Sequence, residues 1–204
     1  IPTAGYKFGY STCCRTPVLG NIDNSNSRGY YLEVEMFPEP GQSYASSSPR
    51  FINLPSMAWL AQSPFILTQP AIDPDGDSIF YTMVDAREGT FSINTTLPYM
   101  PTMSGAQPLG AAYPITTNQS TGLFSCPNPV PQNYYQFNIE VASVKNGAIT
   151  SIIHRDLVAV VSATPPALPT ISLTNYNGVG PSGWCIHHCG WAQGSGLHRY
   201  SSGG

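Results

Sequence analysis

The chain has 204 residues, of which 41% are hydrophobic and only 9% are charged, and its formal net charge is −3. Because soluble globular chains carry roughly 25% charged residues, hydroxyl, amide and aromatic groups must cover much of this surface, as in secreted, extracellular or cell-surface proteins. A nucleic-acid partner has no electrostatic basis at this charge, and no stretch approaches the roughly 18 to 20 apolar residues of a membrane span.

Alternation of apolar side chains with a period of two predicts β-strands along most of the chain. The first two strands are expected in GYKFGY, residues 5–10, and in YYLEVEM, residues 30–36. In the second of these, Glu33 and Glu35 take the face opposite the apolar side chains. Shorter strands, separated by turn-rich segments, are expected at residues 50–53, 64–68, 78–84, 89–93 and 121–125.

The longest strand pair is predicted toward the end of this series. YYQFNIEVASV, residues 134–144, and ITSIIHRDLVAVV, residues 149–161, flank the dipeptide Asn146-Gly147. Asn-Gly between two alternating apolar segments is the strongest short-range signal for a β-hairpin. Many short strands with frequent turns predict an antiparallel β-sandwich.

The chain is expected to contain three regions. Residues 1–48 carry N-terminal strands and read as a partial module or donor segment. Residues 49–163 hold the sandwich, with a Pro/Gly-rich insertion around 97–120. Residues 164–204 form a Pro-rich spacer followed by a tail that contains TISLTNY and GWCIHHCGW. Since the chain begins at Ile1, we expect a mature, trimmed chain or a fragment.

Three aspartates alternate in the segment AIDPDGDSIFY. Asp73, Asp75 and Asp77 bring three carboxylates close together, and a hard cation such as Ca²⁺ relieves their repulsion. The site is not an EF-hand, because Val84 stands where that loop requires its last glutamate. A turn in which the carboxylates accept hydrogen bonds from backbone N–H groups explains the pattern equally well. The sequence therefore leaves a calcium site and a structural turn open.

Several segments resemble one known family. SSPRFINLP, SPFILTQPAIDPDGDSIFYTMV and YYQFNIEVASVKNGAITSIIHRDLVAVV are similar to Ig-like or cadherin-like modules of secreted Bacteroidota surface proteins, including gliding-motility-associated ones. YSTCCRTPVLGNI resembles their Cys-Cys-Arg-Asn element, with Thr16 in place of Asn, and Arg155 and Asp156 resemble their Arg-Asp pair.

The resemblance spans about residues 6–161 and departs from the family in the tail. It implies a scaffold or adhesive unit. The expected fold is an all-β, antiparallel Ig-like β-sandwich with extra N-terminal strands and an irregular C-terminal tail.

The cysteines are expected to be structural. A redox centre favours Cys-x-x-Cys at a helix start, whereas the first two cysteines are adjacent and follow a strand. A secreted context favours disulfides. Because the number of cysteines is odd, one thiol is free, pairs between chains or completes a vicinal bridge, and the connectivity stays open. The candidates are Cys13, Cys14, Cys126, Cys185 and Cys189.

The segment CIHHC is the second cysteine-rich feature. Cys185, His187, His188 and Cys189 could supply zinc ligands, with His198 nearby. Their spacing is not that of a zinc finger or ribbon, so a disulfide between the two cysteines is favoured over zinc.

Glycosylation is expected at three side chains. Asn94 and Asn118 begin the sequons NTT and NQS, which fall in or beside the insertion. Ser78 follows Asp77 and precedes an aliphatic residue, which resembles the O-glycosylation acceptor of Bacteroidota proteins.

Two functions are compatible with these features. The first is a structural subunit of an extracellular filament or surface appendage, in which copies of the chain join head-to-tail through their terminal strands. Residues 1–48 look like the closing strands of a module without its opening strands, and a strand from a neighbour would pair the exposed edge. The alternative is an adhesive or carbohydrate-binding module of a larger cell-surface protein, with glycans as partners.

Enzymatic activity is not expected. The sequence contains no nucleophile-elbow motif and no Gly-rich phosphate loop before a helix. The tripeptide HRD at residues 154–156 occurs in kinase catalytic loops, but no other kinase element accompanies it. We interpret it as an ion pair on a strand.

Overall fold

The computed structural model describes residues 2, 4–55 and 57–164, which lie within one compact unit. This part of the chain is built from β-strands, and its only helical element is a single turn of 3-10 helix, η1 (Ser25–Ser27). It contains no helix long and apolar enough to cross a membrane. The strands are β1 (Tyr6–Cys13), β2 (Gly29–Met36), β3 (Arg50–Phe51), β4 (Ala58–Leu60), β5 (Phe65–Thr68), β6 (Ala71–Ile72), β7 (Ser78–Met83), β8 (Arg87–Gly89), β9 (Asn94–Thr96), β10 (Thr116–Asn118), β11 (Leu123–Cys126), β12 (Asn133–Lys145) and β13 (Ala148–Ser162).

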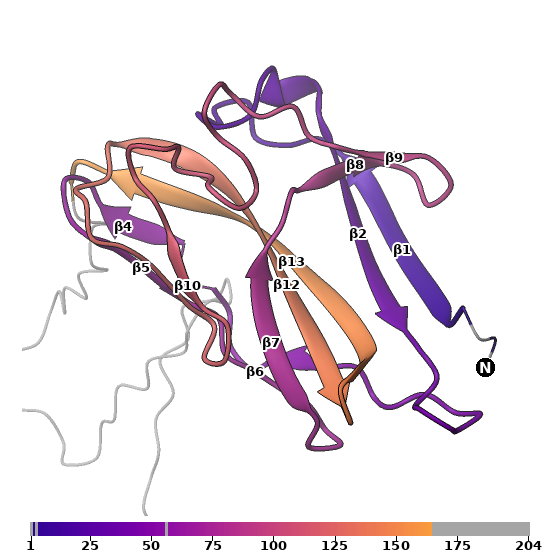
Figure 1. The fold of residues 1–204 in the computed structure, drawn as a ribbon. Coiled ribbons are helices and arrows are strands. Elements are labelled where there is room, and N and C mark those ends of the chain that lie inside the picture. Colours follow the sequence, from indigo (N-terminus) through magenta and orange to yellow (C-terminus); the bar gives the residue numbers. More distant parts are fainter. Residues whose placement is uncertain (1, 3, 56, 165–204) are drawn as a thin grey trace, which may run out of the picture. The chain divides into compact units, whose positions relative to one another are not determined.

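The largest sheet has eight strands. Its main path runs β7-β12-β13-β2-β8-β9, while β1 pairs with β2 and β4 pairs with β13 (Figure 1). A three-stranded sheet, β10-β11-β5, and a two-stranded sheet, β3-β6, complete the described part. All these strand pairs are antiparallel except β4–β13. The prediction of an all-β, mainly antiparallel, sandwich-like fold is confirmed.

The hairpin β12–β13 forms the centre of the large sheet. Its strands have 13 and 15 residues, and Asn146 and Gly147 connect them with φ angles of 51° and 79°. Both angles lie in the left-handed region that a two-residue hairpin turn of type I′ requires. The predicted Asn-Gly hairpin therefore has its expected turn chemistry.

The core lies between the large sheet and the three-stranded sheet. Phe137 from β12 and Phe65 from β5 are 0% and 1% exposed, and their ring centroids lie 5.3 Å apart in a stacked arrangement. Trp59 from β4 packs against the same Phe65 ring at 4.5 Å. Other buried members of this core are Leu67, Ala71, Tyr81, Met83, Leu109, Ile115, Phe124, Cys126, Val130, Tyr135, Ile139, Val141, Ile153, Leu157, Ala159 and Val161.

The structure places the N-terminal strands and corrects one expected strand. Residues 1–48, expected as N-terminal strands that read as a partial module or donor segment, contribute β1 and β2 to the large sheet, where β2 pairs with β13 at residues 151–153 and with β8 at Arg87. Residues 89–93, expected as a strand, contain the turn between β8 and β9, since Gly89 has a φ of 112° and Thr90 N–H donates to Ile93 O.

Candidate functional site

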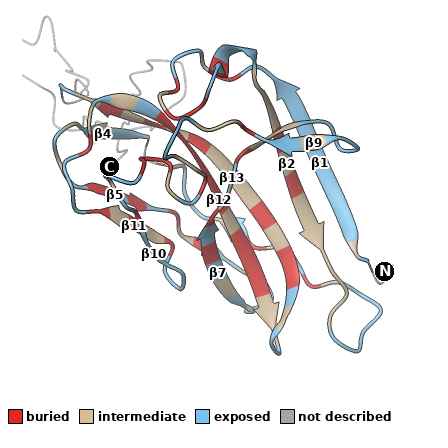
Figure 2. Ribbon diagram, turned by 45° about the horizontal axis from the view of Figure 1, so that its top comes forward, coloured by how far each residue is buried: buried red, intermediate tan, exposed pale blue. Residues whose placement is uncertain are grey.

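Strand β1 is an exposed edge of the large sheet. All eight of its residues are exposed, and β2 is its only strand partner among the described residues. Its largest side chains are Tyr6, Phe8 and Tyr10, which are 48%, 60% and 65% exposed. We call these three side chains the β1 face. Figure 2 shows β1 as exposed along its whole length, beside the partly buried β2.

The β1 face lies on the side of the large sheet that holds the core. Phe8 is opposite Val34 of β2, and Val34 is opposite Ile153 of β13. Residues opposite each other in neighbouring strands point to the same face of a sheet. Ile153 is buried in the core and Val34 packs against it. The apolar surface of the core therefore continues outward from β13 through β2 to β1.

Arg15 anchors this edge to the centre of the molecule. Its side chain is fully buried, and all five of its N–H donors have acceptors. The guanidinium holds both carboxylate oxygens of Asp156 on β13, at 2.8 and 3.1 Å. It also donates to the Gln136 side chain of β12 and to the backbone oxygens of Gly29 and Arg87. One side chain thus joins β2, β8, β12 and β13.

The ion pair expected within HRD is formed by different residues. Asp156 pairs with Arg15, and the Arg155 guanidinium instead donates to Gln69 Oε1 at 2.6 Å and lies over the Phe51 ring at 3.7 Å. The correction has a geometric reason, because successive residues of a strand point to opposite faces of the sheet.

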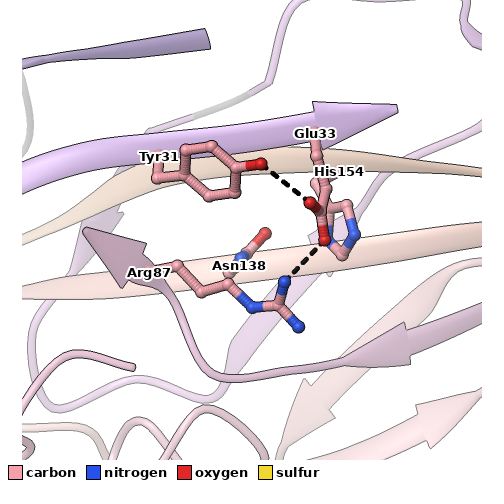
Figure 3. Close-up of a pocket in the computed structure, with 5 residues that line it drawn as sticks. All are labelled: Tyr31, Glu33, Arg87, Asn138 and His154. Atoms are coloured by element: carbon pink, nitrogen blue, oxygen red, sulfur yellow. Dashed lines mark hydrogen bonds and ion pairs between the residues drawn. The ribbon is translucent and has the colours of Figure 1, made fainter. Parts of the chain in front are cut away.

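A second polar cluster joins β2 to the strands on either side of it. Glu33 accepts hydrogen bonds from the Tyr31 hydroxyl and from Arg87, and these residues border a small pocket with Asn138 and His154 (Figure 3). The lining residues include no Ser, Thr or Cys side chain. Two buried atoms of this cluster, His154 Nδ1 and Asn138 Oδ1, have no hydrogen-bond partner in the described part.

Burial, hydrogen bonding and nearby charges together shift the pKa values of His154 and Glu33 in this cluster. Burial lowers the pKa of His154 below its ordinary value of 6.5, and nearby Arg87 lowers it further. Burial by itself raises the pKa of Glu33, but the hydrogen bond from Tyr31 and the charge of Arg87 outweigh it, so the net shift is downward. At neutral pH the cluster therefore holds a neutral imidazole beside an ionised, paired carboxylate.

We expect His154 to make the protein less stable as the pH falls. The unfolded chain gains a proton on this imidazole near pH 6.5, whereas the folded chain gains it only at lower pH, so acid favours the unfolded state in that window. One proton limits the slope to about 1.4 kcal/mol per pH unit. Urea unfolding between pH 7.5 and 5.0 measures how the free energy of unfolding depends on pH.

His154→Gln provides the matched control for this pH dependence, because it removes the titrating group and leaves the chain's other histidines in place. The charged groups that face His154 are Glu140, which is 3.9 Å away, and Glu33, Glu35, Lys7 and Arg87. If His154→Gln loses stability between pH 7 and 5.5 as steeply as the parent, titratable groups other than His154 cause the pH dependence.

The three aspartates of the predicted calcium site accept hydrogen bonds from the protein. Asp73 Oδ1 accepts from the backbone N–H groups of Asp75 and Asp77. Ser46 Oγ lies within hydrogen-bond distance of both Asp75 and Asp77, at 2.9 and 3.0 Å. Among the described residues, no three His, Cys, Asp or Glu side chains are grouped as a metal site. The geometry agrees with the structural turn, and calcium binding stays a prediction.

The cysteines of the described part are arranged in two ways. Cys13 and Cys14 are bonded to each other at the end of β1. Cys126, counted among the disulfide candidates, is instead a free thiol in the core, 0% exposed, and its Sγ lies 3.8 Å from Asn128 O. The zinc or disulfide candidates Cys185, His187, His188, Cys189 and His198 lie outside the described residues.

The predicted glycosylation residues lie on short strands. Asn118 and Ser78 are exposed, in β10 and β7, and Asn94 is half-buried in β9. The Asn118 Oδ1 accepts from the N–H groups of Ser120 and Thr121, which closes a turn. Their modification stays a prediction.

Comparison with known proteins gives no relative. No family model, no curated protein and no solved structure matches this chain. The resemblance to Ig-like modules of Bacteroidota surface proteins therefore stays a prediction, and the all-β fold is the class that the structure defines.

Proposed function

We propose that this chain is a structural subunit of an extracellular filament or surface appendage, and that β1 is one of the terminal segments through which copies join head-to-tail. The observation that carries the proposal is the β1 face. Three large aromatic side chains, each about half exposed, lie on the face of the large sheet that holds the core. Their strand has no partner on its outer edge in the described part. A partner that covered them would remove that area from water at about 25 cal/mol per Å².

The composition of β1 supports an assembling edge. Soluble sheets protect their edges with lysines, prolines, bulges or covering loops. β1 contains no proline, and its single charge, Lys7, is paired with Glu35 at 2.9 Å on the face opposite the aromatic side chains. The unpaired backbone groups of such an edge can form hydrogen bonds to an added strand. In this binding mode, pockets for alternate side chains of the added strand give specificity.

The buried polar groups support a structural role for this edge. Arg15 and the Glu33–Arg87 pair join β2 to β8, β12 and β13, so β1 is attached to a strand that is fixed to the core. A preordered binding strand loses less conformational entropy on association than a flexible one. The bond between Cys13 and Cys14 suits an oxidising, extracellular location. We assign no catalytic role to these polar groups.

Substitution of Phe8 by lysine tests the proposal on the full chain. We expect the parent protein to form particles whose mass increases with concentration, measured by light scattering and negative-stain microscopy. Removing one buried aromatic contact and adding a charge should raise the concentration needed for assembly about 10- to 100-fold, since burying a Phe side chain contributes about 1.5–3 kcal/mol.

Ser11→Lys is the matched control, because Ser11 is exposed on the same strand and points to the opposite face. It should assemble as the parent does. If the parent chain stays monomeric at high concentration, the filament proposal is wrong, and the adhesive or carbohydrate-binding module takes its place.

A further inference from the structure

Arg155 is a partly buried cation that has no carboxylate partner in the described part of the chain. Acidic partners are in excess, because the chain carries 11 Asp and Glu residues against 8 Lys and Arg residues. The side chains that form ion pairs with them are Lys7, Arg15, Arg28, Arg87 and Lys145. The other cation without such a pair in the described part, Arg50, is exposed. Arg155 is therefore the described cation that is both shielded from water and without a counter-charge.

Three segments of the fold hold the Arg155 guanidinium in place. The residue belongs to β13, and its Nη1 donates at 2.6 Å to Oε1 of Gln69, which lies between β5 and β6 and is 0% exposed. The guanidinium carbon lies 3.7 Å from the ring centroid of Phe51 in β3. Nε and Nη2 donate to no acceptor in the described part, and neither is one of its buried unpartnered atoms. One edge of the guanidinium thus presents the two-donor fork that binds a carboxylate with two parallel hydrogen bonds.

Hydrogen-bond donors exceed acceptors around this fork. The Nε2 atom of Gln69 is buried and has no hydrogen-bond partner in the described part. Burial lowers the pKa of Arg155, and no nearby carboxylate opposes that shift. A charge and an amide that lose hydration without gaining partners cost free energy. An anion with acceptor oxygens at the fork would supply the missing counter-charge.

We propose that Arg155, held by Gln69 and Phe51, binds a carboxylate group of a ligand. A carboxylate carries one negative charge, which matches a single guanidinium, and its two oxygens match the fork. A phosphate group carries about −1.5 to −2 charges at pH 7 and would leave negative charge uncompensated at a single cation. The inference goes beyond the proposed function, because none of these three residues belongs to β1.

Equilibrium dialysis of the full chain tests this site with three radiolabelled probes at constant ionic strength. Acetate represents a free acid, galacturonate represents an acidic sugar, and galacturonate methyl ester is the neutral match. We expect one molecule of either acid to bind per chain with a Kd on the order of 1 mM, as two charge-assisted hydrogen bonds provide. The methyl ester should show no saturable binding. An affinity for galacturonate about tenfold above that for acetate would identify a sugar as the source of the carboxylate, and equal affinities would identify a free acid.

Variants of the two arginines without an ion pair locate the binding. Arg155→Met should weaken the binding of both acids about 10- to 100-fold, because it removes the charge and both hydrogen bonds. Arg155→Lys keeps the charge but loses the fork, so we expect a loss of about tenfold. Arg50→Met is the matched control and should bind both acids as the parent does. Circular dichroism checks folding, and Arg155→Lys decides the outcome if Arg155→Met does not fold.

The same measurements can overturn the inference. It is wrong if neither acid binds more tightly than the methyl ester, or if the parent and both Arg155 variants bind the acids equally well. Inorganic phosphate that displaces galacturonate at a lower concentration than acetate does would overturn the assignment of a carboxylate. Dialysis counts bound ligand on monomers and on assemblies alike, so the result does not depend on whether copies of the chain join.

Discussion

Replacing Arg15 with methionine is expected to lower the free energy of unfolding by about 3–5 kcal/mol, the usual cost of removing one partner from a buried ion pair. The side chains of Arg15 and Asp156 are 0% and 2% exposed, so the variant leaves a carboxylate inside the protein without its cation. Gln136 and two backbone oxygens lose a donor as well. Urea unfolding at pH 7 measures the change.

The pH dependence of this variant identifies the cause of the loss. Burial raises the pKa of the Asp156 carboxyl, and the Arg15 guanidinium opposes that shift in the parent. Without Arg15 the carboxyl can be neutralised by protonation, so the difference from the parent should shrink as the pH is lowered toward 5. A difference that stays constant with pH would show that lost packing, and not the unpaired charge, causes the instability.

Arg28→Met is the matched control for this prediction. Arg28 pairs with Glu88 at 3.1 Å, and both side chains are partly exposed, at 26% and 18%. Water screens such a pair, and its removal should cost less than about 1 kcal/mol. Equal losses in the two variants would contradict the anchoring role given to Arg15. The Arg15 variant should also assemble poorly, because Arg15 holds β2, the strand with which β1 pairs.

Phe137→Ala is expected to lower the free energy of unfolding by about 3–5 kcal/mol. The side chain is 0% exposed and stacks on Phe65 across the space between the large sheet and the three-stranded sheet. Its removal loses the transfer free energy of the ring and leaves a cavity where the two layers meet. Urea unfolding measures the loss. If the free energy of unfolding depends on urea concentration with the same slope as in the parent, the loss arises from packing in the folded state.

Phe80→Ala controls for the loss of an aromatic side chain from the same sheet. Phe80 lies on β7, next to β12, and is 43% exposed. Its replacement should cost about 1 kcal/mol or less, because the site is open and no cavity forms. A loss below about 1.5 kcal/mol for Phe137→Ala would mean that the two layers are held mainly by other contacts.

The local pattern of the sequence predicts the strands well where polar and apolar residues alternate. Residues 30–36 and 134–144 are strands with the expected alternation, and Asn146-Gly147 is the expected hairpin turn. Prediction fails where the apolar pattern is short or the backbone turns. β4, β6 and β10 have two or three residues each, too few for a periodic signal, and they exist because neighbouring segments pair with them.

The candidate site was only partly accessible to sequence reasoning. The alternation in GYKFGY identifies Tyr6, Phe8 and Tyr10 as one face. Their exposure depends on which strands the second sheet covers. The sequence shows Arg15 only as part of a short motif beside two cysteines. Its role as an anchor is not visible there, because its partner Asp156 is 141 residues away.

By itself, the sequence determined the strand-rich fold class, the low-charge surface and the hairpin at residues 146–147, because these depend on composition and on neighbours a few residues apart. The tertiary structure alone decided that Asp156 pairs with Arg15, that Cys13 bonds to Cys14 while Cys126 stays free, and that β1 lies at an exposed edge. The physical reason is that strand order and register bring together residues from distant segments. An alternating pattern fixes the two faces of a strand, but it does not specify the neighbour against which each face packs.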